Sequence, residues 1–295
     1  YNYLIFMNNL LNKKIIVLGT GFLGGYVLDK LKINGISSEG TNYQNISNSI
    51  KLNATNIEEV EKYLISVKPE TVINCVGIGD IDFLEKNPTI AYKINSDSAK
   101  NIAKICNKLG IYMIHISTDS VFDGQTGMYK ENDKVNPLNI YTKSKIIAED
   151  YVQDNAKNSV IIRTNFYGFD KKNRWFFNWI INSLSSGKKI TGFTDLIFNP
   201  LEIFNLSNLL IELTTIKHEG ILHLSSNDFL SKYDFIMKVA SVFNFDKSLI
   251  VKGNSSFQVK RPKNTTLDNS ISKRILKTSI TPLDLCLNNI KLNFF

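Results

Sequence analysis

The chain has 295 residues, of which 43% are hydrophobic and 21% charged, and its formal net charge is +8. This length can bury one large core, or a core with a smaller lobe. No run reaches the roughly 18 apolar residues of a membrane span, and the basic residues are scattered rather than massed in a tract. We therefore expect a soluble protein without membrane or nucleic-acid partners.

Cysteine and histidine are few and dispersed. Cys75, Cys106 and Cys286 are widely spaced, and no histidine lies near them, so neither a metal site nor a disulfide framework is indicated. Reduced thiols are typical of the cytoplasm, which is the location we expect. The stretch 1–11 is apolar, short and without a charged N-terminal region, which favours an upstream extension over a signal peptide.

In chain order, the predicted elements alternate. We expect strands at 15–18, 71–76, 111–116 and 159–163, and helices near 25–33, 57–67, 89–109 and 141–152. This alternation predicts an α/β fold with a Rossmann-type doubly wound parallel sheet. After Thr164 it weakens to a helix at 174–184, a loop at 193–200 and a helix at 232–243. We expect a nucleotide-binding domain over 1–164 and mainly a smaller substrate-binding lobe over 165–295, with some segments returning to the sheet.

The first strand runs into a glycine-rich turn. Gly19, Gly21 and Gly24 form G-x-G-x-x-G between a strand and a helical pattern, which is the context of a dinucleotide fingerprint. Gly19 would permit the tight turn, Gly21 the approach of a pyrophosphate, and Gly24 close packing of helix on strand. The alternative is a plain glycine turn, which this context makes the weaker interpretation.

The segment that would meet the cofactor ribose is ambiguous. An acid about 20 residues beyond the fingerprint favours NAD, and an arginine favours NADP. Glu39 is present without an arginine, while Thr41 or Asn42 could bond either ribose form. Both cofactors therefore stay open.

Tyr141 and Lys145, four residues apart, share one helical face. An ammonium beside a phenol favours phenolate, so we expect Lys145 to lower the pKa of Tyr141 from about 10 towards the range of a useful proton donor. Ser117 and Thr118 end the strand that starts at Ile111, where ligands of open α/β sheets bind. Thr118 could then donate to a substrate carbonyl, whereas Ser117 could simply start a turn.

Other candidates have plainer interpretations. The helical spacing of the aromatic residues at 175–179 favours core packing over stacking on a base or sugar. His115 lies on an apolar strand, so we expect a buried core histidine. His218 and His223 straddle Gly220 and suggest a turn.

In order along the chain, these motifs resemble an extended short-chain dehydrogenase/reductase of the dTDP-4-dehydrorhamnose reductase (RmlD-like) type. The resemblance runs from about residue 14 to 276. Besides the glycine turn and the Tyr141–Lys145 pair, it rests on residues 74–77, 81–85, 117–124, 136–138, 163–164, 261–262 and 267–269.

The resemblance implies NAD(P)H-dependent reduction of the C4 keto group of a nucleotide-activated sugar, with a homodimer left open. The implied catalytic residues are Thr118, Tyr141 and Lys145. The implied cofactor-binding residues are Gly19, Gly21, Phe22, Leu23, Gly24, Asn42, Asn53, Cys75, Val76, Gly77 and Asn95, with Tyr141 and Lys145. The implied substrate-binding residues are Thr118, Asp119, Ser120, Asn165, Phe166, Asn199 and Arg261. Asp82 and Glu85 match family acids, or are solvated or helix-capping carboxylates.

Two departures from the family pattern concern the sugar pocket. Ser120 replaces a tyrosine, and Asn165 and Phe166 replace serine and tryptophan, so we expect a different sugar to be accepted. Ser120 also replaces the cysteine acid/base of relatives such as GDP-fucose synthase, which favours reduction without prior epimerisation. The alternatives are an NAD-dependent nucleotide-sugar epimerase or dehydratase, and a non-catalytic NADP-binding subunit similar to the methionine adenosyltransferase β-subunit.

Overall fold

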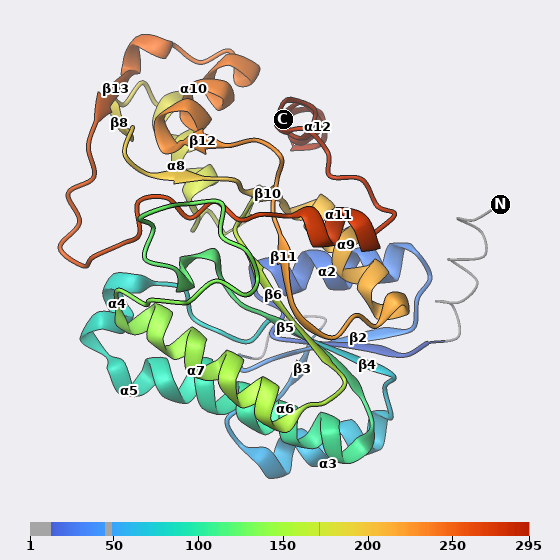
Figure 1. Ribbon diagram of the computed structural model, residues 1–295. Helices are drawn as coiled ribbons and strands as arrows, with labels where there is room; N and C mark the ends of the chain where they lie inside the picture. The colour runs from blue at the N-terminus through green and yellow to red at the C-terminus, as the bar shows by residue number, and fades with distance from the viewer. Residues whose placement is uncertain (1–12, 45–48, 171, 295) are drawn as a thin grey trace.

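A parallel sheet forms the centre of the computed structural model, which describes residues 13–44, 49–170 and 172–294. Seven strands follow the order β11-β6-β5-β4-β1-β2-β3, every neighbouring pair being parallel (Figure 1). This confirms the predicted Rossmann-type α/β fold. The order reverses between β1 and β4, the switch point at which open α/β sheets bind ligands. The strands are β1 (Ile15–Leu18), β2 (Ser38–Asn42), β3 (Ile50–Lys51), β4 (Thr71–Asn74), β5 (Tyr112–Ile116), β6 (Ser159–Thr164) and β11 (Gly220–Leu224).

Helices cover both faces of the sheet, as β1 shows. All four residues of β1 are fully buried, and they alternate between two apolar clusters, Ile15 and Val17 in one and Ile16 and Leu18 in the other. This is the two-residue period of a strand buried on both faces. On the first face lie α2 (Phe22–Ile33) and α9 (Ile203–Ile216), and on the second α3 (Ile57–Val67), α6 (Ser98–Leu109) and α7 (Ile140–Asn155) (Figure 1).

The prediction of one continuous α-helix over 89–109 is wrong, because a π-helical turn interrupts it. The chain instead forms α5 (Pro88–Ala91), a π-helical turn η1 (Tyr92–Asp97) and then α6. A π turn is a local widening that recurs at functional sites. It carries the buried Asn95, and α4 (Ile81–Lys86) precedes it.

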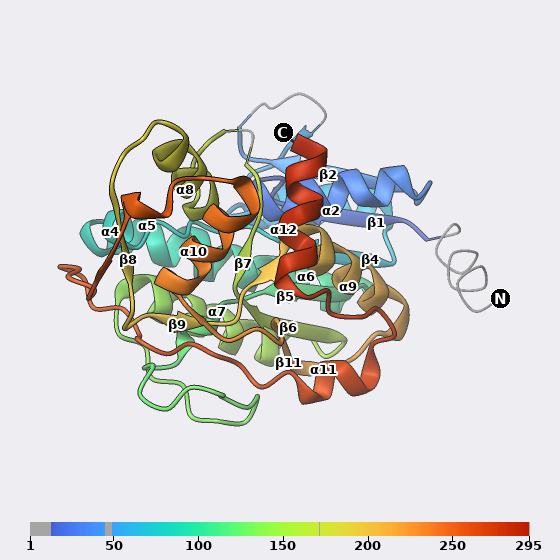
Figure 2. The same cartoon turned by 90° about the horizontal axis from the view of Figure 1, so that it is seen from above.

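The C-terminal lobe lies above the carboxyl ends of the central strands (Figure 1; Figure 2 views it from above). Its own apolar cluster joins α8 (Phe176–Ser185), α10 (Lys232–Phe243) and α12 (Leu283–Phe294). Two-residue strands β7 (Phe166–Tyr167) and β10 (Leu201–Glu202) pair, as do β9 (Ile197–Phe198) and β12 (Leu230–Ser231). The remaining elements are β8 (Ile190–Phe193) paired with β13 (Ile250–Gly253), η2 (Asp119–Val121), η3 (Lys247–Leu249) and α11 (Ser270–Ile275).

Three further expectations need correction. His223 is not in a turn but in β11, fully buried, with Nδ1 3.0 Å from the Tyr129 carbonyl oxygen. The predicted loop at 193–200 contains β9. Helix α9 is not among the predicted elements. It is buried on most sides, so its apolar residues do not form a single stripe along the helix.

Two side-chain expectations can be compared with burial. His115 is a fully buried core residue, as predicted, with Nδ1 3.0 Å from Asn74 Nδ2. Phe177 is buried as predicted, but Trp175 and Trp179 are 40% and 41% exposed, so core packing is the wrong interpretation for both tryptophans. The expected extension at 1–11 lies outside the described residues. No described helix is both long and apolar enough to cross a membrane.

Candidate active site

The glycine turn leaves the N-terminus of α2 open. Gly19 has φ +85°, and a Cβ there would lie 2.8 Å from the Val76 backbone nitrogen. A Cβ on Gly24 would lie 2.2 Å from the Gly19 carbonyl oxygen, whereas one on Gly21 would meet nothing within 4 Å. Gly21 is the N-cap residue, so no side chain caps the first N–H groups of α2, beginning at Phe22 and Leu23. An uncapped helix N-terminus of this kind fits a diphosphate.

The edge strands end beside this turn. Asn42 ends β2, its Nδ2 lies 3.4 Å from Thr20 Oγ1, and its carbonyl oxygen accepts a hydrogen bond from the Leu52 backbone. The neighbouring Asn53 uses its side-chain oxygen to accept hydrogen bonds from Thr55. Asn42 and Asn53 therefore lie near each other at the carboxyl end of the sheet.

Glu39 is not at that strand end. It lies inside β2 and pairs with Lys14, the two charged atoms being 2.8 Å apart. Tyr63 also donates a hydrogen bond to it over 3.3 Å. The carboxylate is thus held by neighbouring strand and helix residues, which removes it as a marker for NAD.

The start of α7 is fixed from several sides, which places Tyr141 in its first turn. Asn139 caps the helix through a reciprocal capping box with Thr142. Glu85, from α4, accepts a hydrogen bond from the Ile140 backbone over 2.9 Å. Glu85 is therefore a helix-capping carboxylate, one of its two expected roles. Asp82 instead binds Arg261, with 2.7 Å between carboxylate and guanidinium.

Thr118, Tyr141 and Lys145 come together where β5 ends. Thr118 is buried and hydrogen-bonds Tyr141. The Lys145 ammonium donates to the Ile116 carbonyl over 2.6 Å. Burial lowers the pKa of Lys145 to about 8, while the nearby Glu149 and Cys75 act in the opposite direction. At neutral pH this lysine is still mainly an ammonium.

The expected effect of Lys145 on Tyr141 is not what the structure shows. Burial raises the pKa of Tyr141 to about 12, the bond with Thr118 lowers it, and the Asp119 charge raises it further. Lys145 is held by the Ile116 carbonyl, so the ammonium does not act as the partner that lowers the phenol pKa. Tyr141 is consequently a protonated phenol throughout the neutral range.

Asn95 links the loop after β4 to helix α7. Its side chain accepts from the Ile78 backbone N–H (2.8 Å) and donates both to the Ile78 carbonyl (3.1 Å) and to Ser144 Oγ (3.0 Å). A Cβ on Gly77 would come within 3.3 Å of its oxygen. Cys75 and Val76 lie at the start of the same loop, and burial raises the pKa of the Cys75 thiol to about 12. Asn95 therefore fixes this loop against α7.

A buried ion pair supports the same edge. Arg163 on β6 bonds Glu149 on α7, with 2.7 Å between Nη2 and Oε2, and both side chains are at most 4% exposed. Ser117 also donates a hydrogen bond to Glu149. Of the two neighbouring hydroxyls, Ser117 thus serves the ion pair and Thr118 faces Tyr141.

Asp119 is the shared hydrogen-bond acceptor for polar groups of the expected sugar pocket. It is 2% exposed, and its carboxylate accepts hydrogen bonds from Asn165 (2.9 Å) and Ser120 (3.0 Å). Burial raises the pKa of Asp119, and these hydrogen bonds oppose the shift. Ser120 therefore has a carboxylate beside its hydroxyl, which sequence reasoning did not anticipate.

Asn199 is the expected substrate residue that the structure places elsewhere. It is 2% exposed, and its Nδ2 lies within 3.1 Å of oxygens from Ser225, Ser226 and Leu267, while its oxygen accepts the Leu267 N–H. Both of its donor hydrogens are used within the protein, and its oxygen accepts one backbone N–H. Asn199 therefore joins distant segments of the chain through hydrogen bonds, and we no longer propose it as a substrate contact.

The lobe side of the site includes residues that the motifs did not mark. The ring centres of Phe166 and Phe22 are 5.9 Å apart, and Trp175 stacks on Phe22 with 5.7 Å between ring centres. Lys232, the first residue of α10, lies over the ring of Phe198. No local signal could have found Lys232, because its neighbours come from distant segments.

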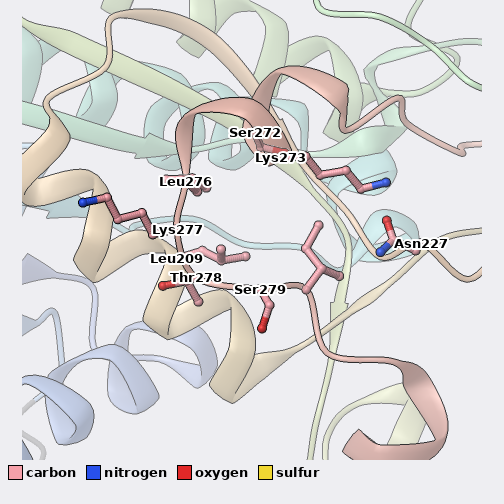
Figure 3. Close-up of a pocket in the computed structure, with 9 residues that line it drawn as sticks. Leu209, Asn227, Ser272, Lys273, Leu276, Lys277, Thr278 and Ser279 are labelled. Carbon is pink, nitrogen blue, oxygen red and sulfur yellow. The ribbon is translucent and has the colours of Figure 1, made fainter. Parts of the chain in front are cut away.

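Surface hollows are also found among the described residues. One, of about 670 Å³, is lined by Arg261, Lys260 and Phe257 from the segment after β13 and by Gly124 and Leu138. The other, of about 210 Å³, lies between α9 and α11, and its lining includes none of Thr118, Tyr141 and Lys145 (Figure 3). Leu209, Leu276 and Ser279 are among the residues that line the second one.

Comparisons with known proteins show to which family the chain belongs. The model of the RmlD substrate binding domain family matches residues 13–290. A probable low-salt glycan biosynthesis reductase of Haloferax volcanii is 30% identical over 84% of this chain and 87% of its own length. Subunit beta of methionine adenosyltransferase 2 from Bos taurus is 25% identical over 88% of this chain and 81% of its own. A crystal structure of a dTDP-4-dehydrorhamnose reductase from Clostridium acetobutylicum has TM-score 0.86 and 26% identity over 94% of this chain and 98% of its own. The chain belongs to the RmlD substrate binding domain family.

Proposed function

We propose that this protein is an NAD(P)H-dependent oxidoreductase that reduces the C4 keto group of a nucleotide-activated 6-deoxy sugar, in the manner of a dTDP-4-dehydrorhamnose reductase. The observation that carries the proposal is the meeting of Thr118, Tyr141 and Lys145 at the carboxyl ends of the strands, the same edge of the sheet at which α2 begins without a side-chain cap. Family membership and a relative named a reductase support it.

The residues present fit a nicotinamide dinucleotide. Gly21 leaves its space open, and the N–H groups that follow it have no side-chain cap. When bound, the nicotinamide supplies the hydride that reduction of a carbonyl requires. Asn42 and Asn53 lie at the strand ends, where the adenosine ribose of the fold is bound. Glu39 is occupied by Lys14, so the choice between NAD and NADP is part of the test.

The protein's own groups then handle the oxygen of the sugar. Tyr141, whose pKa of about 12 keeps its proton at neutral pH, donates that proton to the oxygen as the C–O double bond is reduced. Thr118 donates a hydrogen bond to the same oxygen and so stabilises its developing negative charge. Lys145 supplies a nearby positive charge, since it remains mainly an ammonium below pH 8.

A direct assay tests the proposal. Purified protein is mixed with NADPH or NADH and a panel of 4-keto nucleotide sugars, and the loss of reduced cofactor is followed by absorbance. Oxidation that depends on the sugar is expected with at least one pair. Cofactor that co-purifies, resists dialysis and shows no net turnover would favour the epimerase or dehydratase alternative.

A second candidate has its own support. Relatives named methionine adenosyltransferase 2 subunit beta cover most of this chain at 24–26% identity. Under this reading the protein binds the cofactor without turning it over. Tight NADPH binding with no oxidation for any sugar in the panel, together with complex formation with a methionine adenosyltransferase catalytic subunit, would favour it.

A further inference from the structure

Trp175, the N-cap residue of α8, connects two loops that flank the switch point of the sheet. Its indole ring stacks on that of Phe22, the first residue of α2, with 5.7 Å between ring centres and 16° between ring planes. Two atoms of the same indole, Cη2 and Cζ3, would lie 3.8 and 3.9 Å from a Cβ on Gly79, in the loop between β4 and α4. One side chain of the lobe therefore reaches from the loop after β1 to the loop after β4.

These two loops are the ones between which this fold binds a dinucleotide. The dinucleotide lies in the crevice where the strand order reverses, here between β1 and β4. Its diphosphate is held at the N-terminus of the helix that follows the first strand, which in this chain begins at Phe22. A side chain that contacts both loops therefore lies across the crevice.

Hydrogen bonds fix the chain on either side of this tryptophan. The Asp170 carboxylate pairs with the Arg174 guanidinium over 2.9 Å. The Asp170 backbone N–H donates to Asn178 Oδ1 over 2.7 Å, and Asn178 Nδ2 donates to the Asp170 carbonyl over 2.9 Å. Tyr26 of α2 donates to the Phe169 carbonyl over 2.6 Å. The start of α8 is thus tied both to the segment before it and to α2, which keeps the indole over the crevice.

Exposure separates this role from core packing. Trp175 and Trp179 are 40% and 41% exposed, although indole is among the side chains that gain most from burial. Trp179 lies one turn further along α8 and stacks on Phe176, with 5.9 Å between ring centres. The two tryptophans are equally exposed, but Trp175 is the one that contacts both loops of the crevice.

We propose that Trp175 covers the bound nicotinamide dinucleotide, packing its indole on the cofactor between the start of α2 and the loop after β4. The inference rests on the proposed function, since it assigns a residue to the cofactor of that reaction. The indole adds affinity by burying its exposed surface, and it keeps water out of the crevice. Because the ring carries no charge, it covers NAD and NADP alike.

Fluorescence tests the inference, because Trp175 and Trp179 are the two tryptophans of the chain. In Trp179→Phe only Trp175 emits, and in Trp175→Phe only Trp179 emits. Each variant is titrated with acrylamide, a neutral quencher that does not compete with an anionic cofactor, in the absence and presence of saturating NADP⁺ or NAD⁺. The oxidised forms are used because a reduced nicotinamide accepts excitation energy from either tryptophan at a distance.

The cofactor should lower the quenching constant of Trp175 at least about twofold, since a ligand in a crevice buries most of the surface that it contacts. The quenching constant of Trp179, whose initial exposure is nearly the same, should not change. In calorimetric titrations, Trp175→Ala should weaken cofactor binding about 10-fold, mainly through faster dissociation. Trp175→Phe should retain most of the affinity because a phenyl ring can still pack on the cofactor, and Trp179→Ala, the matched control, should bind like the wild type.

Thermal melting checks that each variant is folded. The inference is wrong if the wild-type protein binds neither cofactor, or if Trp175 is as accessible to acrylamide with cofactor as without it. An unchanged cofactor affinity in Trp175→Ala would overturn it as well. Equal protection of both tryptophans would also contradict it, because that result indicates a general tightening of the lobe rather than a contact.

The outcome can be separated from that of the reductase assay. Protection of Trp175 without reduction of any 4-keto sugar would retain the cofactor contact and reject the reductase. Sugar reduction by a protein in which Trp175 stays accessible would retain the reductase and reject the contact. With both correct, Trp175→Ala raises KM for the reduced cofactor more than it lowers kcat, because the indole binds the cofactor equally in ground and transition states.

Discussion

The two walls of the candidate site are built in different ways. On the sheet side, Tyr141 lies in the first turn of a capped helix, and Lys145 is tied to a backbone carbonyl where β5 ends. On the lobe side, Trp175 and Lys232 rest on aromatic rings and are held by no hydrogen bond of their own charged or polar end among the described residues. The residues proposed for the chemistry thus lie at the ends of regular elements, whereas the side chains of the lobe wall are placed by tertiary packing.

The largest expected effect tests the sheet-side wall. In Gly21→Val, the valine occupies the open space at the N-terminus of α2, so cofactor binding should be abolished while the fold remains, because no protein atom lies within 4 Å of the new Cβ. NADPH titration by fluorescence and thermal melting measure the two properties. Gly25→Val is the control, since Gly25 also has nothing within 4 Å but lies inside the helix. Unchanged NADPH affinity in Gly21→Val would show that the N-terminus of α2 does not bind the cofactor diphosphate.

The next effect contrasts ion pairs of the two regions. Glu149→Gln leaves the buried Arg163 without its charge partner, so the free energy of unfolding should fall by about 3–5 kcal/mol. In the lobe, Lys238 and Asp284 are 37% and 64% exposed, so Asp284→Asn should cost less than about 1 kcal/mol. Denaturant unfolding compares the two. Equal losses would show that the sheet-side wall is no more firmly held than the lobe.

A smaller expected change concerns the proton donor. Tyr141→Phe should lower kcat at least about 100-fold, the usual scale for a positioned proton donor, and leave cofactor affinity nearly intact. Single-turnover kinetics and NADPH titration separate the two quantities. Tyr151→Phe, on the same helix but under the ammonium of Lys100, should behave like the wild type. Near-normal turnover in Tyr141→Phe would remove this phenol as the acid.

The smallest expected effect is the absence of hydrogen exchange between the sugar substrate and solvent. In D₂O without reduced cofactor, the protein should leave the C3 and C5 protons of a 4-keto sugar in place. The Ser120 hydroxyl donates a hydrogen bond to Asp119, and burial raises the pKa of the Cys75 thiol to about 12. Proton NMR of the sugar follows the exchange. Enzyme-dependent deuterium uptake at either carbon would show that the Ser120–Asp119 pair acts as a base, and would restore an epimerase function.

Local spacing was enough to predict the features that depend on nearby residues. The glycine turn could be predicted because each glycine answers a steric demand of its own neighbourhood, such as the Gly19 carbonyl 2.2 Å from a Cβ on Gly24. Tyr141 and Lys145 could be placed together because a helix fixes residues four apart on one face. The parallel sheet likewise follows from the alternation of apolar strands and helices.

The surroundings of the other candidate residues depend on contacts between distant segments. Glu39 has a suitable sequence position, but it is the second residue of β2, away from the carboxyl end of the strand, and its carboxylate binds Lys14 and Tyr63. Asn199 matches the expected pattern, yet Ser225, Ser226 and Leu267 use all its donors. The sequence by itself determined the fold class and singled out Tyr141 and Lys145 as candidates, because those depend on periods and spacings within one element. Only the tertiary structure set Lys232 and Arg261 beside Asp119, because these residues are separated by up to 142 positions and meet only through packing of the lobe on the sheet.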